Sequence, residues 1–384
     1  MDHPWFQRLR RISQLGLSHL VYPGAVHNRF HHALGAMHLM HKAIDEIRKK
    51  GHEITEDEAR GVIIAILLHD VGHGPFSHAL EHSLVRGMSH EDFSALIMSK
   101  LNDDMNGALD TAIEIFNNHY PKRFLHQLVS SQLDMDRLDY LRRDSFYSGV
   151  TEGAVSSERI IKMLNVVDDE LVVEEKGIYS IEKFIVARRL MYWQVYLHKT
   201  VISAEFMLVK ILSRAKELAG QGKDLFASPA LHLFLYNDFD ASDFHPESDT
   251  LAQFASLDDY DILGAIKVWQ ENSDTVLSTL CRKLVSRELF KTEVQKEAFD
   301  TSYKHELLTE LSSHFGVTYE EATYFIIDQK IDNRAYSKAA DSIKIRFKDG
   351  SLKDAATASD HLNLSALSQP VEKYFLCYPL VSRQ

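Results

Sequence analysis

Two histidines and two aspartates in this sequence have the chemistry of metal ligands. They are His32, the adjacent His69 and Asp70, and Asp136. Imidazole and carboxylate ligands together suit Fe, Mn, Zn or Ni, and they leave coordination positions open for water and for a phosphate oxygen. A metal ion held in this way lowers the pKa of bound water and polarises a phosphoryl oxygen. The four residues therefore predict hydrolysis of a phosphate ester.

The segment that carries His69 and Asp70 predicts a buried helix with a polar end. An apolar run over residues 62–68 places hydrophobic side chains on one helical face. Residues 71–75, Val-Gly-His-Gly-Pro, then stop the helix, because two glycines loosen the backbone and the proline removes a donor. A histidine and an aspartate at this point could also serve only as a helix cap. The metal hypothesis therefore depends on the other two segments.

Those two segments are also expected to be helical. A helix predicted to begin at Asn28 and to end near Lys50 places Arg29 and His32 on one face. Asp136 lies in residues 133–144, which alternate carboxylates and arginines. Such a run is usually a solvated face, but its leucines indicate partial burial, and buried charges need partners or a metal.

The remainder of the chain predicts further helices and a few strands. We expect a hairpin within residues 167–181 that turns at Lys176-Gly177, and one long amphipathic helix from about 181 to 219. Residues 220–256 are acidic and are predicted to be mainly loop. Strand-like runs follow at 324–327, 342–347 and 374–378.

Composition limits the class of protein and its partners. The chain has 384 residues, is 45% hydrophobic and carries a formal net charge of −12, which argues against general adhesion to nucleic acid or anionic membranes. Only Cys281 and Cys377 occur, without a CxxC pair, and no apolar run approaches the roughly 20 residues of a membrane span. With no recognisable secretory signal, we expect a cytoplasmic enzyme without disulfides.

Five ordered motifs resemble the HD-domain metal-dependent phosphohydrolases. More narrowly, they resemble the deoxynucleoside triphosphate triphosphohydrolases (dNTPases), including the mammalian enzyme that pairs a sterile-alpha-motif domain with an HD domain. The motifs are FQRLRRISQLG, HNRFHHALG, LLHDVGHGPFSH, SHED and DMDRLDYLRRD. This resemblance implies a mainly α fold with a helical HD core and a small α+β C-terminal lobe. The expected domains are the core at 1–220, a helical extension with an acidic loop at 221–300, and the lobe at 301–384.

The resemblance implies that a dNTP and water give a deoxynucleoside and inorganic triphosphate. The metal ligands would be His32, His69, Asp70 and Asp136, holding a divalent ion (Fe, Mn, Zn, Ni or Mg), and additional Mg could accompany the triphosphate. The matching catalytic positions are His90, His73, His78 and Glu81, where the family usually has an aspartate at the last. The matching substrate positions are Gln14, Arg29, Arg137, Tyr140, Asp144, Arg188 and Tyr196.

A regulatory nucleotide and self-association are also implied by the resemblance. Asp2, Gln7 and Arg10 match guanine-binding activator positions, although the same residues could simply cap a helix and face solvent. A homodimer or homotetramer is expected. Two alternatives stay open. The chain could hydrolyse another nucleotide, such as a dNMP or a guanosine alarmone, or it could be a nucleotide-sensing scaffold without turnover.

Overall fold

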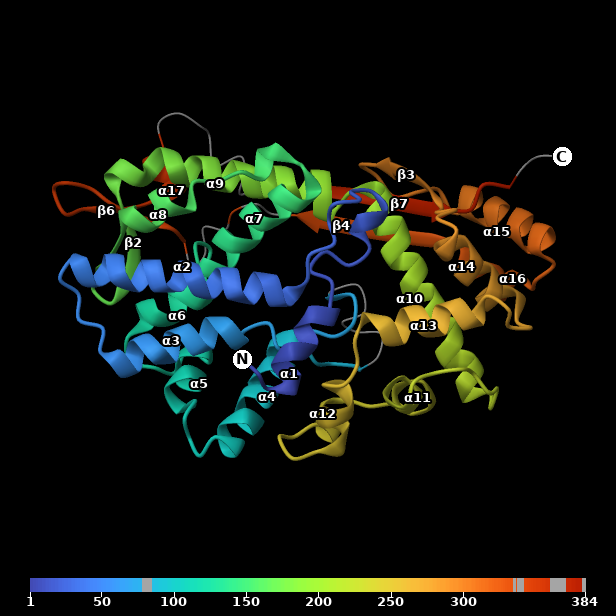
Figure 1. The fold of residues 1–384 in the computed structure, drawn as a ribbon. Helices are drawn as coiled ribbons and strands as arrows, with labels where there is room; N and C mark the ends of the chain where they lie inside the picture. The colour runs from blue at the N-terminus through green and yellow to red at the C-terminus, as the bar shows by residue number, and fades with distance from the viewer. Residues whose placement is uncertain (78–84, 334–335, 337–341, 360–370, 382–384) are drawn as a thin grey trace.

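The computed structural model shows a mainly helical protein with two small sheets (Figure 1). It describes residues 1–77, 85–333, 336, 342–359 and 371–381. The mainly α fold class expected from the sequence is confirmed. Within the described residues, no helix is both long enough and apolar enough to cross a membrane.

The first half of the chain forms a helical bundle around α2, Arg29–Lys49, and α3, Glu56–Leu68. The helix α7, Met135–Ser148, packs against α2, and α5 packs against α3. The other helices of this half are α1 Pro4–Gln7, α4 His90–Asp104, α5 Asp110–Phe116, α6 Arg123–Val129 and α8 Ser157–Met163.

The helix starts that matter for the site are set by capping side chains, and the start of α2 after Asn28 is the one that the sequence predicts. Asn28 caps α2 by accepting from the backbone N–H of His31, and Thr55 caps α3 by accepting from that of Glu58. Ser89 caps α4 in the same way. These caps fix where His32, His69 and His90 fall on their helices.

Two expectations about the middle of the chain are wrong. The hairpin turns at Asp168 and Asp169, both with positive φ, between β1, Leu164–Val167, and β2, Glu170–Glu174. The turn predicted at Lys176-Gly177 is wrong because Glu170–Glu174 pairs antiparallel with the strand that precedes it, and not with the residues that follow it.

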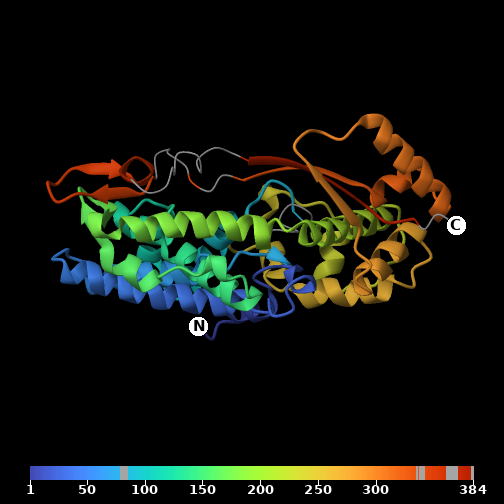
Figure 2. The ribbon, with the colours of Figure 1, turned by 90° about the horizontal axis from the view of Figure 1, so that it is seen from above.

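The single helix expected over residues 181–219 is two helices. They are α9, Ile178–Met191, and α10, Lys199–Gly220. A π-helical turn at Tyr192–Tyr196 lies between them, and its wider winding breaks the α-helical periodicity (Figure 2).

The acidic segment at 220–256 is more ordered than its composition indicated. It contains α11, Pro229–Tyr236, and α12, Asp249–Phe254, which bury Phe234 and Phe254 in the core. Two further helices follow, α13 Asp259–Trp269 and α14 Thr275–Val285. The structure of the acidic segment at 220–256 is therefore decided by its few large apolar side chains and not by its charge.

The two sheets join distant parts of the chain. One sheet has the order β1-β2-β5-β6, in which β5, Lys344–Arg346, lies parallel to β2, and β6 is Leu352–Asp354. The other has the order β3-β7-β4, with β3 Lys291–Gln295, β4 Ile327–Asn333 and β7 Val371–Tyr378. The remaining helices are α15 Thr301–Phe315, α16 Tyr319–Ala322 and α17 Ala355–Ala358. Pairing of β2 with β5 crosses both expected domain boundaries, which stay predictions.

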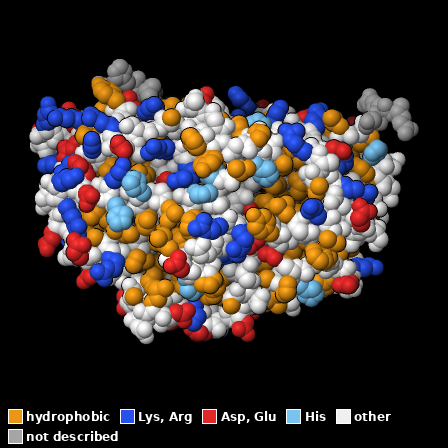
Figure 3. All heavy atoms as spheres, in the orientation of Figure 1, with side chains coloured by type: hydrophobic (Ala, Val, Ile, Leu, Met, Phe, Trp, Pro, Cys, Tyr) orange, Lys and Arg blue, Asp and Glu red, His pale blue; other side chains and the backbone are white. Residues whose placement is uncertain are grey.

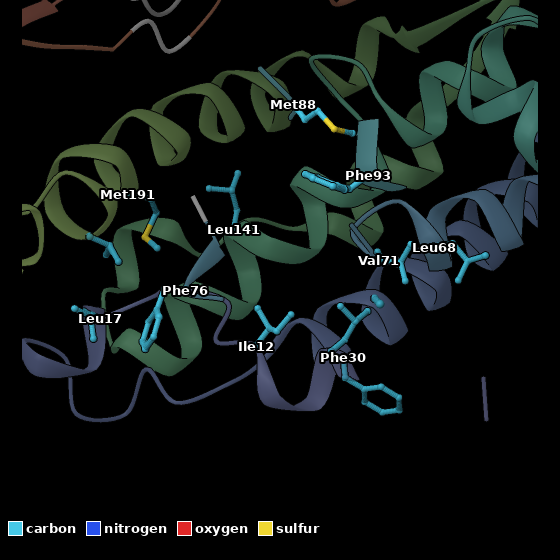
Figure 4. Packing of buried hydrophobic residues seen from close by; sticks show 14 of the residues in the cluster. Ile12, Leu17, Phe30, Leu68, Val71, Phe76, Met88, Phe93, Leu141 and Met191 are labelled. Carbon is cyan, nitrogen blue, oxygen red and sulfur yellow. The ribbon is translucent and has the colours of Figure 1, made fainter. Parts of the chain in front are cut away.

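One hydrophobic core connects these elements, from Phe6 near the N-terminus to Tyr378 in β7. Figure 4 shows Phe76 among buried side chains of the N-terminal segment and of α7, including Leu17 and Leu141. On the face drawn in Figure 3, acidic and basic side chains are interspersed with hydrophobic ones.

The loop after α3 is held in a strained backbone conformation. Phe76 and Ser77 have φ of 54° and 56°, a region that side chains with Cβ rarely adopt. Asp259 accepts from the Phe76 N–H at 2.7 Å and from the Ser13 N–H at 2.8 Å. Arg8 donates to the carbonyls of Val71 and His73 in the same loop.

Arg8 is therefore a buried brace for the loop that follows the metal-ligand pair. It is 1% exposed, and its guanidinium also donates to the carbonyl of Leu257 at 2.9 Å. Its bonds to Val71 and His73 are 2.9 and 2.5 Å long. Burial lowers the pKa of Arg8 to about 10, so the group stays charged at neutral pH.

Replacing Arg8 should destabilise the protein strongly. Arg8→Met keeps most of the side-chain length but leaves three buried carbonyls without a donor, so the free energy of unfolding should fall by about 3 kcal/mol or more. Urea unfolding followed by circular dichroism measures this change. The exposed Arg10 is the matched control, and Arg10→Met should move the midpoint much less. Equal losses for the two variants would contradict the role given to Arg8.

Candidate metal centre and nucleotide cavity

The four predicted metal ligands come together from three helices. His32 lies in the first turn of α2, and His69 and Asp70 directly follow α3. Asp136 is the second residue of α7. The proximity expected from their chemistry is therefore present in the fold.

Their ligand atoms converge on one point. Oδ1 of Asp136 lies 3.0 Å from Nε2 of His32 and 3.6 Å from Nε2 of His69. The carboxylate of Asp70 lies 3.3 Å from His69 Nε2 and 3.6 Å from His32 Nε2. Both Nε2 atoms are buried, and neither has a partner in hydrogen-bond geometry among the described residues. Two buried nitrogens facing two carboxylates fit the donor set of a divalent cation.

The opposite nitrogen of each ring is already engaged, which orients Nε2 toward this point. Nδ1 of His32 pairs with Oδ2 of Asp139 at 2.8 Å, and Nδ1 of His69 pairs with the carbonyl of Ile66 at 2.7 Å. Arg143 donates twice to Asp139. Such partners of metal-binding histidines fix the tautomer that leaves Nε2 free to coordinate.

Gly35 allows α2 and α7 to approach closely enough for this arrangement. A Cβ on Gly35 would lie 2.0 Å from Oδ1 of Asp139 and 2.1 Å from the Arg143 guanidinium. Any larger side chain at this position would displace the carboxylate that orients His32.

The ionisation of the cluster follows from its burial and its charges. Burial disfavours the charged form of His32, but the carboxylates of Asp136 and Asp139 raise its pKa to about 10. Burial would raise the pKa of Asp70, whereas Arg29 and the neighbouring histidines hold it well below its usual range. Both ligand types therefore stay charged near neutral pH, and a metal ion at Nε2 would replace the His32 proton.

The metal cluster opens into a cavity of about 410 Å³. Most of the residues predicted to bind substrate or to act in catalysis line it. Those residues are Gln14, Arg29, His73, His90, Arg137, Tyr140, Asp144 and Tyr196. A second cavity, of about 540 Å³, reaches the cluster from the side of His69 and shares Asp70, His90, Asp136 and Arg137 with the first.

His73 and His90 lie beside the metal ligands. Their ring centroids are 3.9 Å apart, and Nδ1 of His73 is 3.3 Å from Oδ1 of Asp70. Both rings face the cavity, where proton transfer to a bound phosphate ester is geometrically accessible. His78 and Glu81, the other two predicted catalytic residues, lie outside the described residues.

Two of the three predicted phosphate-binding arginines line the cavity. Arg29 pairs with Asp70 and donates to the Ser77 hydroxyl at 2.8 Å. Arg137 pairs with the buried carboxylate of Asp134, and its Nε has no hydrogen-bond partner among the described residues. Arg188 does not line the cavity, and its guanidinium lies 5.9 Å from the ring centroid of Tyr192. The two arginines that line the cavity therefore lie beside the candidate metal ligands.

The other end of the cavity combines a buried carboxylate with aromatic side chains. Asp144, which is 1% exposed, accepts from the Tyr196 hydroxyl at 2.8 Å and pairs with His27 at 2.7 Å. The ring of Tyr140 meets that of Tyr196 edge to face, 6.1 Å between centroids. Oε1 of Gln14 is buried without a hydrogen-bond partner in the described structure. This end offers flat apolar surface with a few fixed polar groups, as sugar and base sites do.

The three predicted regulatory residues lie apart from this cavity. Asp2 and Arg10 are exposed, and Arg10 donates to Oε1 of Gln7 at 2.7 Å. The Arg10 guanidinium also covers the ring of Phe30, 3.6 Å from its centroid. The structure thus joins Gln7 and Arg10 on the surface, and a role in nucleotide binding stays a prediction.

Sequence reasoning missed residues that support the site. Asp139 lies one helical turn after Asp136, so its spacing could have placed it beside His32. His27 carried no such signal, because a lone histidine in a loop usually only packs. Glu205 was also missed and lines the cavity.

Loss of Asp136 should remove the metal, and loss of Asp139 should weaken its binding. Asp136→Ala deletes a ligand, so metal content should fall to background after dialysis. Asp139→Asn leaves the ligands in place but loosens His32, so metal affinity should fall about 10- to 100-fold. Plasma mass spectrometry and competition with a chelator measure the two effects. Asp45→Asn, on the exposed face of α2, is the control, and full metal content in Asp136→Ala would show that this ligand was assigned wrongly.

Comparison with known proteins agrees with the geometry. The HD-domain family model matches residues 29–144, and the model of the HD associated region matches residues 155–227. The chain is 36% identical over 329 residues to the uncharacterized protein YwfO of Bacillus subtilis, covering 84% of this chain and 72% of that protein.

Solved structures and curated dNTPases are also similar. A crystal structure of a phosphohydrolase from Bacteroides thetaiotaomicron has a TM-score of 0.95 and 57% identity, covering 99% of this chain and 94% of that one. The SAMHD1 deoxynucleoside triphosphate triphosphohydrolase homolog of Dictyostelium discoideum is 35% identical over 238 residues, which are 56% of this chain and 46% of that protein. The match thus spans less than half of that relative. The chain belongs to the HD-domain family of metal-dependent phosphohydrolases, in which it is related to the dNTPases.

Proposed function

We propose that this protein hydrolyses dNTPs to deoxynucleoside and inorganic triphosphate. One observation carries the proposal. The cluster of His32, His69, Asp70 and Asp136 opens into a cavity that has two arginines, Arg29 and Arg137, at this end and aromatic side chains at the far end. A nucleotide has the same polarity, with phosphates at one end and a sugar and base at the other.

The chemistry needs water to attack the α-phosphorus. The new bond joins the water oxygen to that phosphorus, and the bond from phosphorus to the sugar O5′ breaks. When bound, a divalent metal supplies an activated water and a polarised phosphoryl oxygen. Arg29 and Arg137 supply positive charge for the phosphate oxygens, and His90 carries the proton that the leaving O5′ takes up.

The far end of the cavity fits a 2′-deoxyribose. Asp144 is fixed by His27 and Tyr196, so its carboxylate is oriented to accept a hydrogen bond from the sugar 3′-hydroxyl. Tyr140 and Tyr196 leave little space beside the sugar, which disfavours a 2′-hydroxyl. The SAMHD1 relatives are deoxynucleoside triphosphate triphosphohydrolases, which supports the same substrate class. A homo-oligomer, and an activator nucleotide at Asp2, Gln7 and Arg10, belong to the same proposal.

Product analysis tests the reaction directly. Metal-loaded protein incubated with each dNTP, NTP and dNMP should release triphosphate and free deoxynucleoside from dNTPs alone, as measured by ion-exchange chromatography. In water enriched in oxygen-18, the label should appear in the triphosphate, because water attacks phosphorus. Pyrophosphate or orthophosphate as the product would instead assign the protein to another phosphohydrolase activity. Tight dNTP binding with no product would assign it to a nucleotide sensor.

Replacement of His90 should slow turnover without removing the metal. His90→Gln keeps a polar side chain of similar reach but cannot transfer the proton, so kcat should fall about 100- to 10,000-fold. Metal content by mass spectrometry and KM for the dNTP should stay close to those of the unmodified protein. A variant that keeps normal kcat would show that another group moves the proton.

A further inference from the structure

Glu205, on α10, is an acidic side chain in the cavity with no partner in the protein. It lines the cavity that also contains Gln14 and Tyr196. No hydrogen bond or ion pair joins it to any other residue in the described part of the chain. The other cavity carboxylates differ, because Asp70, Asp136 and Asp144 all contact histidines.

An unpartnered carboxylate in such a place is costly. Burial raises the pKa of Glu205 to about 8, and no neighbouring cation offsets this effect. With this pKa the side chain is mainly protonated at neutral pH, and its ionised form is stabilised only when N–H or O–H donors reach the two oxygens. Within the described residues the protein supplies none, so a ligand is the natural source of these donors.

The position of Glu205 indicates which part of the ligand it meets. Gln14 and Tyr196 line the sugar end of the cavity, and both chain segments continue toward Glu205. A Cβ built on Gly16, two residues after Gln14, would lie 2.9 Å from Oε1 of Glu205. Gly16 has φ of 49°, so this position favours glycine, and the absence of a side chain leaves the carboxylate accessible. Beyond the sugar of a nucleotide, away from its phosphates, lies the base.

We propose that Glu205 recognises the base of the nucleotide and favours guanine. A carboxylate presents two acceptor oxygens side by side. Guanine has two adjacent donors, N1–H and the N2 amino group, on one edge, and both can be bound at once. Adenine and cytosine place a single amino group beside an acceptor nitrogen, and thymine places one N–H between two carbonyls. This inference rests on the proposed function and adds base selectivity to it.

The test compares Glu205→Gln with the unmodified protein on dGTP, dATP, dCTP, dTTP and deoxyinosine triphosphate. The amide replaces one acceptor by a donor at constant size. The unmodified protein should have a kcat/KM for dGTP about tenfold or more above the other three natural substrates. Deoxyinosine triphosphate, which lacks the N2 amino group, should fall between them. In Glu205→Gln, kcat/KM for dGTP should drop about tenfold or more, whereas the other three should change less than about threefold.

Equilibrium binding separates this inference from the proposed reaction. Calorimetric titration of the metal-chelated protein with each nucleotide should show the same guanine preference, and the same loss of it in Glu205→Gln. If binding is selective but no triphosphate is released, the proposed function fails and the inference stands. If hydrolysis occurs with equal kcat/KM for all four dNTPs, or if the variant loses all four equally, the inference fails and the function stands.

Two controls exclude a merely structural effect. Glu217→Gln changes the same charge on the same helix, and Glu217 pairs with Arg214 outside this cavity, so base selectivity should stay unchanged. Glu205 is half-buried and unpartnered, so replacing its carboxyl by an amide should not destabilise the fold, and the melting temperature of Glu205→Gln should equal or exceed that of the unmodified protein. A lower melting temperature would show that Glu205 has a structural role, contrary to this inference.

Discussion

The structure depends on the burial of two imidazoles against two carboxylates at the junction of three helices. His32 is fully buried, and Asp70 is 5% exposed, so their charges must be compensated within the protein. Arg29 partly neutralises Asp70, and Asp139 balances His32 from the other side. The two imidazoles and two carboxylates therefore stay together instead of each being hydrated by water. A divalent cation at this point would bind the imidazole lone pairs and neutralise the remaining negative charge of the carboxylates.

This cluster constrains the loop that leaves it. After Asp70 the chain turns, which brings His73 into the cavity, and further along the same loop Phe76 and Ser77 adopt unfavourable φ values. The stabilising contacts come from far along the sequence, because Arg8 and Asp259 bond to the loop backbone. The strain at the site is thus supported by the N-terminal segment and by α13, which have no direct contact with the metal ligands.

The cavity has arginines at one end and aromatic side chains at the other. Arg29 and Arg137 gather at the metal end, and the π-helical turn presents Tyr192 and Tyr196 at the other. The break between α9 and α10 also changes the helix direction, so that Glu205 faces the same cavity.

The sequence by itself indicated the candidate metal ligands and determined the start of α2 and the mainly helical class, because these depend on residue chemistry, capping and local hydrophobic periodicity. The order of the motifs also identified the family. Only the tertiary structure decided which distant residues support the site, since Arg8, Asp139 and Asp259 act through contacts that no local pattern encodes. The wrongly placed hairpin turn and the unexpected π-helical turn have the same cause, because strand pairing and helix breaks depend on long-range packing that short windows of sequence do not contain.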